Sequence, residues 1–71
     1  MEKSHIPNRI KAVLAERQRT SKWLAGEMDK TDMTVSRWCT NKVQPSITQL
    51  IEIARLLEVD VKDLLNTTKE E

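Results

Sequence analysis

The sequence predicts an all-α fold, a compact five-helix domain, and three observations support that prediction. Its 71 residues include one glycine and two prolines, too few for the many turns of a small β protein. Apolar residues recur at helical spacing, and no segment alternates apolar and polar residues as a half-buried strand does. The length corresponds to a single small domain, near the lower size limit for a chain that folds alone.

The composition narrows the possible function classes. The single cysteine excludes an internal disulfide, and one cysteine with one histidine cannot build a zinc site. No apolar run approaches the roughly 18–20 residues that cross a bilayer, and the polar N-terminus does not resemble a signal peptide. Cys39 falls on an apolar helix face, so we do not expect a catalytic nucleophile. We therefore expect a cytoplasmic protein with no catalytic, cofactor or metal site.

The first two helices are placed by their capping residues and apolar faces. The first helix is expected to begin between Ser4 and Asn8, because Pro7 is tolerated in a first helical turn. Thr20 is a good N-cap for the second helix, and Asp29 accepts the left-handed backbone that would end it. The apolar faces are Ile6, Ile10, Val13 and Leu14 in the first helix, and Leu24, Ala25 and Met28 in the second.

The third helix follows after a very short turn. Thr31 is its expected N-cap, and the helix should cover about residues 32–40 with Val35 and Trp38 on the buried side. Only about three residues separate it from the second helix, which makes the two helices cross steeply, as in a helix-turn-helix. The third helix would then lie on the surface with one face free.

Two more helices complete the expected domain. Ser46 and Gln49 form a capping box at the start of the fourth helix, and Asp60 opens the fifth. The fourth has a broad apolar face of Ile47, Leu50, Ile51, Ile53, Ala54 and Leu57, and the fifth carries Val61, Leu64 and Leu65. We expect the domain over residues 8–66, preceded by residues 1–7 as a tail or helix start and followed by a frayed tail at 67–71.

An ordered set of residues carries a resemblance to a known family. In chain order they are Thr20, Leu24, Ala25, Thr31, Thr34, Val35, Ser36, Arg37, Pro45 and Ser46, followed by Leu50, Ile53, Ala54, Leu57, Val59, Leu64 and Leu65. Over about residues 8–66 the chain resembles the Cro-like (Xre-type) phage-repressor helix-turn-helix family. The resemblance implies binding of double-stranded DNA through the second and third helices, usually by a transcriptional regulator.

The chain departs from the family pattern at two kinds of position. The family usually has glycine where this chain has Asp29, Asn41 and Glu58. Asp and Asn tolerate left-handed geometry, whereas Glu58 should cost about 1 kcal/mol. The family often pairs an arginine in the first helix with a glutamate in the third, where this chain has Leu14 and Cys39. We expect an apolar contact in place of that ion pair.

The free face of the third helix is the candidate DNA-reading surface. A recognition helix places its N-terminal residues against base edges in the major groove. Arg37 matches guanine O6 and N7 best, Met33 suits a thymine methyl group, and Asp32 is either a cytosine contact or a helix-dipole cap. The expected base contacts are Asp32, Met33, Ser36 and Arg37. The expected phosphate contacts are Thr20, Ser21 and Lys22 on one flank, and Thr31, Thr34, Asn41, Lys42 and Gln44 on the other.

The net charge of +1 hides a division along the chain. Residues 1–45 carry nine basic and five acidic residues, a balance of +4, whereas residues 46–71 carry three and six, a balance of −3. Such a split favours one polyanion-facing surface and one turned away from it.

We therefore expect a sequence-specific DNA-binding transcriptional regulator, most simply a repressor, with no small-molecule ligand. Because one short helix reads few base pairs, we expect a homodimer joined through Val61, Leu64 and Leu65. The alternative is a protein-interaction module, such as the DNA-binding antitoxin of a toxin–antitoxin pair. Its binding surface would be the acidic second half and the exposed apolar residues of the fifth helix.

Overall fold

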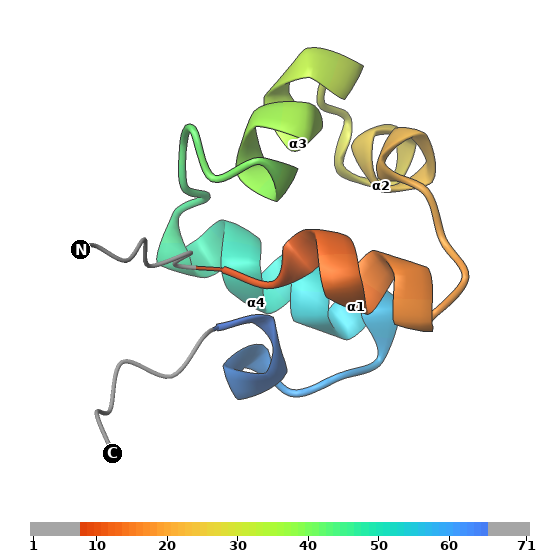
Figure 1. The fold of residues 1–71 in the computed structure, drawn as a ribbon, viewed down its shortest axis with the longest axis vertical. Coiled ribbons are helices and arrows are strands. Elements are labelled where there is room, and N and C mark those ends of the chain that lie inside the picture. The colour runs from red at the N-terminus through yellow and green to blue at the C-terminus, as the bar shows by residue number, and fades with distance from the viewer. Residues whose placement is uncertain (1–7, 66–71) are drawn as a thin grey trace, which may run out of the picture.

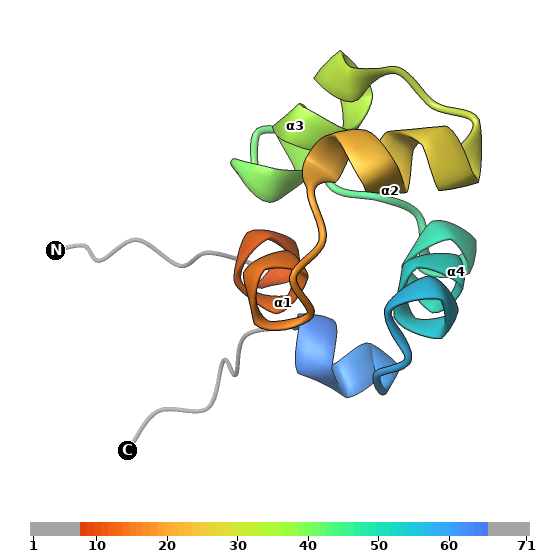
Figure 2. The ribbon, with the colours of Figure 1, turned by 90° about the vertical axis from the view of Figure 1, so that its right-hand side faces the viewer.

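The computed structural model describes residues 8–65, in which the chain forms four α-helices and one short 3₁₀-helix. They are α1 (Ile10–Glu16), α2 (Ser21–Met28), α3 (Asp32–Cys39), α4 (Ile47–Leu57) and η1 (Val61–Leu64). Helices α2 and α3 lie together at one end, and η1 lies at the other (Figure 1 and Figure 2). Helix α2 packs against α3 and α4, whereas η1 packs against α1 and α4. The all-α prediction is confirmed for the described residues, but the fifth helix is only a 3₁₀ turn.

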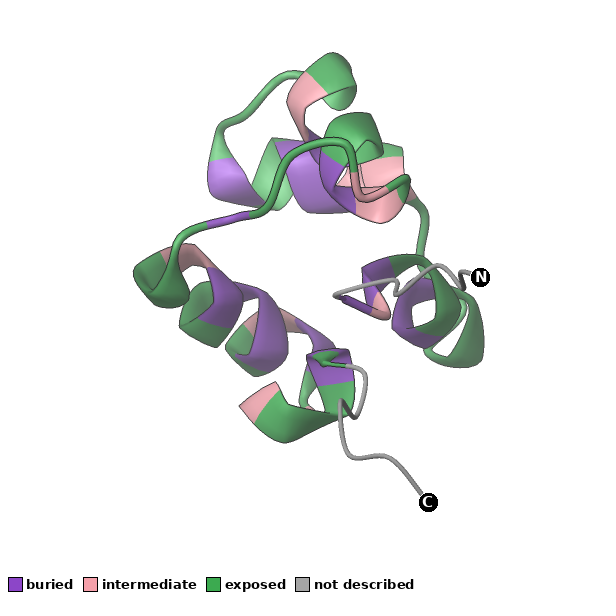
Figure 3. Ribbon diagram, turned by 60° about the vertical axis from the view of Figure 1, so that its left-hand side comes forward, coloured by how far each residue is buried: buried purple, intermediate pink, exposed green. Residues whose placement is uncertain are grey.

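The buried sides of the helices face one another and form one apolar core (Figure 3). The faces predicted for α2 and α3 are confirmed, and Trp38 is a core residue. The core consists of Ile10, Val13, Leu14, Leu24, Ala25, Met28, Val35, Trp38, Leu50, Ile53, Ala54, Leu57 and Leu64. Cys39 packs against this core from its edge, as a half-buried side chain.

The apolar face predicted for α4 is too broad. Leu50, Ile53, Ala54 and Leu57 are buried, whereas Ile47 is 71% exposed and Ile51 is 43% exposed. The buried set follows the i, i+3, i+4, i+7 spacing of a single helix face, and the two exposed isoleucines fall outside it. Helix α4 therefore presents two neighbouring apolar side chains to solvent.

The prediction for the fifth helix is also corrected. Only the four residues of η1 are helical, and Asp60 and Asp63 cap this turn through a reciprocal pair of hydrogen bonds. Leu64 is 0% exposed and belongs to the core, so it is not available as a dimer contact, whereas Leu65 is exposed. In these four residues Leu64 is buried and the half-buried Val61 packs against the core, which is enough to close the core at this end.

The start of α1 differs from the prediction because Asn8 has another role. Helix α1 begins at Ile10, and Asn8 forms an isolated antiparallel bridge with Leu65. The Arg9 amide donates to the Leu64 carbonyl at 2.7 Å, which joins the two ends of the described chain. The expected earlier start, with Ile6 and Pro7, and both predicted tails beyond the domain lie outside the described residues.

Asn8 is 2% exposed and also joins the start of α1 to the loop after α3. Its Nδ2 donates to the Trp38 carbonyl at 3.0 Å and to Gln44 Oε1 at 2.8 Å, and its Oδ1 accepts from the Ile10 amide at 3.0 Å. The side chain of Asn41 accepts from the Asn8 amide at 3.0 Å and donates to the Asn8 carbonyl at 3.3 Å. Buried polar groups of this kind are held by being hydrogen-bonded on several sides.

All four α-helices end in the same way. Each is followed by a residue with left-handed backbone: Gln18, Asp29, Asn41 and Glu58, with φ between 58° and 63°. The next amide then donates back to the helix at 2.8–3.0 Å: Arg19 to Leu14, Lys30 to Ala25, Lys42 to Arg37 and Val59 to Ala54. These are Schellman-type ends, normally built with glycine. Three of the positions were predicted from the sequence, and Gln18 was not.

We predict that Glu58→Gly raises the free energy of unfolding by up to about 1.5 kcal/mol. Glycine removes the left-handed penalty of roughly 1–2 kcal/mol, against an entropic cost of roughly 0.5–1 kcal/mol. The substitution also removes the exposed Arg17–Glu58 ion pair, whose nitrogen and oxygen are 3.6 Å apart, but such a surface pair contributes little to stability. Urea unfolding measures the change, and Asp29→Gly is the control, with a smaller gain because Asp tolerates this geometry. A clear loss of stability for Glu58→Gly would contradict the account of the helix ends.

We predict that Asn8→Ala lowers the free energy of unfolding by about 1–3 kcal/mol, because it removes the partners of buried polar groups. Asn8→Asp should also be destabilising, since a carboxylate cannot donate to the Trp38 carbonyl or to Gln44 Oε1. Urea unfolding of both variants measures the loss. A change below about 0.5 kcal/mol for both, typical of a surface substitution, would show that this cluster does not hold the fold together.

Candidate nucleic-acid interface

The turn between α2 and α3 positions the exposed helix. Asp29 reverses the chain in a left-handed conformation, and the Lys30 amide donates to the Ala25 carbonyl at 2.8 Å. Thr31 then caps α3, because its Oγ1 accepts from the Thr34 amide at 3.1 Å. The predicted turn of three residues is confirmed, and Ala25 is buried in the helix that packs on α3. The two helices form the expected helix-turn-helix.

Helix α3 buries one side and exposes the other. Val35 and Trp38 anchor it in the core. The four expected base contacts, Asp32, Met33, Ser36 and Arg37, are all exposed. They lie on one helix face, because residues 32 and 36, like 33 and 37, are four residues apart, and residues 33 and 36 are three apart. Met33 is 62% exposed although it is apolar, and Arg37 forms no ion pair with any described residue. Such a face is available for a partner.

The start of α2 offers donors to an anion. Thr20 accepts from the Trp23 amide at 3.0 Å and so has the capping role that the sequence suggests. The amides of Ser21 and Lys22 belong to the first turn, and within residues 8–65 they have no acceptor. Unpaired first-turn amides and a neighbouring lysine are the usual elements of a phosphate contact.

The second expected phosphate flank divides into two groups. Thr31 and Thr34 lie at the start of α3, where their hydroxyls are 3.0 Å apart, and Lys42 is exposed after the helix. Asn41 and Gln44 instead bond to Asn8, and Gln44 Nε2 also donates to Asn41 Oδ1 at 3.1 Å. Their side-chain amides form hydrogen bonds on the inner side of the loop. Lys42 is therefore the candidate phosphate contact in this loop whose side chain is exposed and charged.

Sequence reasoning missed Asn8, whose side chain positions that loop. The sequence shows a polar residue of the capping type just before the apolar positions of the first helix. Such a residue indicates a helix boundary, but it does not indicate which distant groups it bonds to. The Asn8 side chain bonds locally to Ile10, and also to Trp38 and Gln44, which lie 30 and 36 residues away along the chain. No local pattern records contacts of that range.

Cys39 has the properties of a packing residue. Burial raises the pKa of its thiol, and the nearby Lys11 ammonium offsets only part of that effect. The thiol is therefore neutral at physiological pH, which does not suit a nucleophile. Within residues 8–65 no group of three potential metal-binding side chains gathers, and no helix there is long and apolar enough to cross a membrane.

Comparison with known proteins agrees with this geometry. A crystal structure of a proposed DNA-binding protein from Bacteroides fragilis is 57% identical and superposes with a TM-score of 0.84, covering 84% of this chain and 97% of that one. No sufficiently similar sequence was found among curated proteins. Residues 9–70 match the family model of the Cro/C1-type HTH DNA-binding domain. The chain belongs to the family of Cro/C1-type helix-turn-helix DNA-binding domains.

Proposed function

We propose that the protein is a sequence-specific transcriptional regulator that reads the major groove of DNA with α3. The observation that carries this proposal is the exposed face of Asp32, Met33, Ser36 and Arg37 on a helix whose other side is fixed in the core. Family membership and the Bacteroides fragilis neighbour support DNA as the partner. Occupation of an operator, which blocks transcription, is the simplest action of such a domain, so we propose a repressor.

In this proposal the side chains divide into those that contact bases and those that contact the DNA backbone. Arg37 would donate two hydrogen bonds to one guanine, Met33 would pack on a thymine methyl group, and Asp32 would accept from a cytosine. The backbone contacts would come from Thr20, Ser21 and Lys22 at α2, and from Thr31, Thr34 and Lys42 at α3. Selection of bound duplexes from random DNA tests the proposal directly, and recovery of no enriched motif would contradict it.

We predict that Arg37→Ala weakens binding to the selected site by about 1–3 kcal/mol and has much less effect on random DNA. Discrimination at one base pair should relax, because the bidentate contact is lost. Lys42→Ala is the matched control. It should weaken both kinds of DNA alike and reduce the slope of log K against log salt concentration by about one unit. Fluorescence anisotropy titrations over a range of salt concentrations measure both effects.

Equal losses on selected and random DNA for Arg37→Ala would identify Arg37 as a phosphate contact. Base reading would then have to come from Asp32, Met33 and Ser36, or from the shape of the DNA.

We also propose that two copies bind each operator. The contact expected through η1 is reduced, since Leu64 is buried and only Leu65 and the half-buried Val61 remain. Ile47 and Ile51 provide further apolar surface on α4, one helical turn apart. These four side chains cover far less than the roughly 1,200 Å² of a stable interface, so the second copy would assemble only on DNA.

We predict that selected sites contain two half-sites about 10 bp apart, each occupied by one protomer. Sedimentation should give a monomer for the free protein and two protomers per duplex at saturation. Ile47→Asp should reduce the cooperativity on the full site and leave binding to a single half-site unchanged. One protomer per duplex at saturation, at any protein concentration, would contradict the dimer.

The exposed isoleucines also keep a second function open, that of an antitoxin-like module that binds another protein. Copurification of one stable polypeptide in fixed stoichiometry, lost on Ile47→Asp, would favour it.

A further inference from the structure

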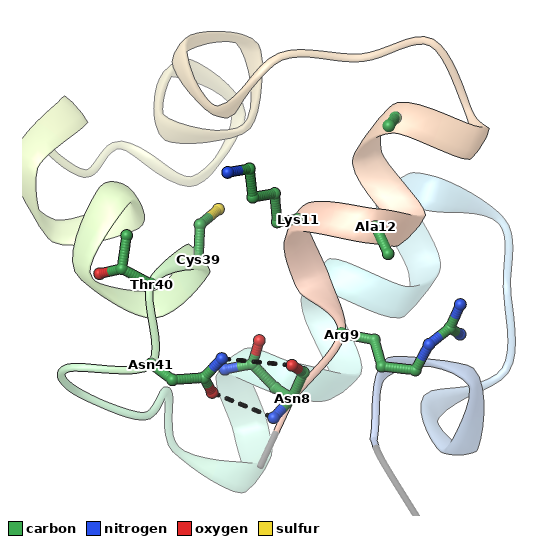
Figure 4. A pocket seen from close by; sticks show the side chains of 8 residues that line it. Asn8, Arg9, Lys11, Ala12, Cys39, Thr40 and Asn41 are labelled. Carbon is green, nitrogen blue, oxygen red and sulfur yellow. Dashed lines mark hydrogen bonds between the residues drawn. The ribbon is translucent and has the colours of Figure 1, made fainter. Parts of the chain in front are cut away.

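A groove lies between α1 and α3, beside the start of α2. Two adjoining hollows of about 640 and 340 Å³ form it, and they share Lys11, Ala15, Cys39 and Thr40. Figure 4 shows the larger hollow, in which the Lys11 side chain reaches from α1 toward the sulfur of Cys39 on α3. No sequence pattern predicts a role for Lys11 or for the outer side of α1.

The groove has positive charge without a carboxylate to balance it. Lys11 lines both hollows, Arg19 lines the smaller one, and no Asp or Glu lines either. Arg9, at the far edge, is paired with Glu16 at 3.2 Å, but Lys11 forms no ion pair with any described residue. The guanidinium carbon of Arg19 lies 4.4 Å from the centroid of the Trp23 ring, which orders the side chain and leaves its charge available.

Hydroxyl groups complete this lining. Ser21 and Ser36 both line the smaller hollow, and neither side-chain hydroxyl has a hydrogen-bond partner within residues 8–65. Thr40 is not a free donor, because its hydroxyl already donates to the Ser36 carbonyl at 3.1 Å. Two cations with two hydroxyl donors match the oxygens of a phosphate group, since charge-assisted hydrogen bonds to such oxygens are the strongest available.

The groove is continuous with the exposed face of α3 through Ser36, which belongs to both. A duplex whose bases face Met33 and Arg37 must place its sugar–phosphate backbone beside that face. Polar contacts to the backbone make up half or more of a protein–DNA interface. Both continuity and charge therefore favour DNA backbone over a free anion as the occupant.

We propose that a DNA backbone phosphate binds in this groove against Lys11, Arg19 and Ser36, so that α1 is part of the DNA-binding surface. This inference rests on the proposed function. It also changes the role of Ser36, which contacts the backbone and reads no base.

The single cysteine provides a probe in the floor of the groove. Wild-type protein is treated with N-ethylmaleimide at mildly alkaline pH, because the raised pKa of Cys39 slows its reaction at neutral pH. When the selected duplex is present at a concentration about ten times its Kd, about a tenth of the protein is free. The rate of Cys39 labelling should therefore fall about ten-fold. Inorganic phosphate at matched ionic strength should give no protection. A Cys39→Ser, Lys62→Cys variant, labelled on η1, is the control. It should react equally with and without a duplex that carries a single half-site, on which no second copy lies beside η1.

The charge is tested separately by substitution. Lys11→Ala should reduce the slope of log K against log salt concentration by about one unit, while Lys62→Ala leaves it unchanged. Ser36→Ala should weaken selected and random DNA by the same factor.

Unchanged labelling of Cys39 in the bound complex, or an unchanged salt slope for Lys11→Ala, would overturn the proposal while DNA binding itself stands. Protection by inorganic phosphate but not by DNA would overturn it in favour of a small anion. Failure of the wild-type protein to bind any duplex would overturn the proposed function as well, and is recognised by the absence of a complex.

Discussion

The fold depends on ending short helices abruptly. The four α-helices in residues 8–65 are only seven to eleven residues long, and each ends with one left-handed residue followed by a hydrogen bond back to the last turn. Such an ending satisfies carbonyls that would otherwise lack partners, and it redirects the chain within two residues. The ending at Asp29 is what allows α3 to begin at once and to cross α2. Without it, the face that carries Arg37 would not be presented.

Asn8 supplies the long-range counterpart of these local endings. Its side chain bonds to the Trp38 carbonyl at the end of α3 and to Gln44 in the following loop, while the neighbouring Arg9 amide bonds to the Leu64 carbonyl. The start of α1, the end of α3 and the last helical turn are thereby held at one place. The loop that carries Lys42 is consequently held by hydrogen bonds on its inner side, and Lys42 itself is exposed.

Local signals were enough to predict the caps at Thr20, Thr31 and Ser46 and the left-handed positions Asp29 and Asn41, because each depends on a few adjacent residues. The left-handed position of Glu58 was expected only from the resemblance to the family. Local signals could not predict the role of Asn8, because several of its hydrogen-bond partners are distant in sequence. They also could not predict the exposure of Ile47, because the sequence pattern of a helix does not show whether another element covers an apolar residue at the edge of its buried face. The exposed face of α3 follows from the positions of Val35 and Trp38. The groove at Lys11 does not, because it is created by the packing of α1 against α3.

The central claim is that the exposed face of α3 contacts DNA, and amide and side-chain NMR shifts during titration with a selected duplex test it most directly. The account predicts the largest changes at residues 31–37, including the guanidinium of Arg37, with smaller changes at Ser21, Lys22 and Lys42. On a duplex with a single half-site it predicts almost none at η1. Changes centred on Ile47 and Ile51, with α3 unaffected, would contradict it and place the partner on α4.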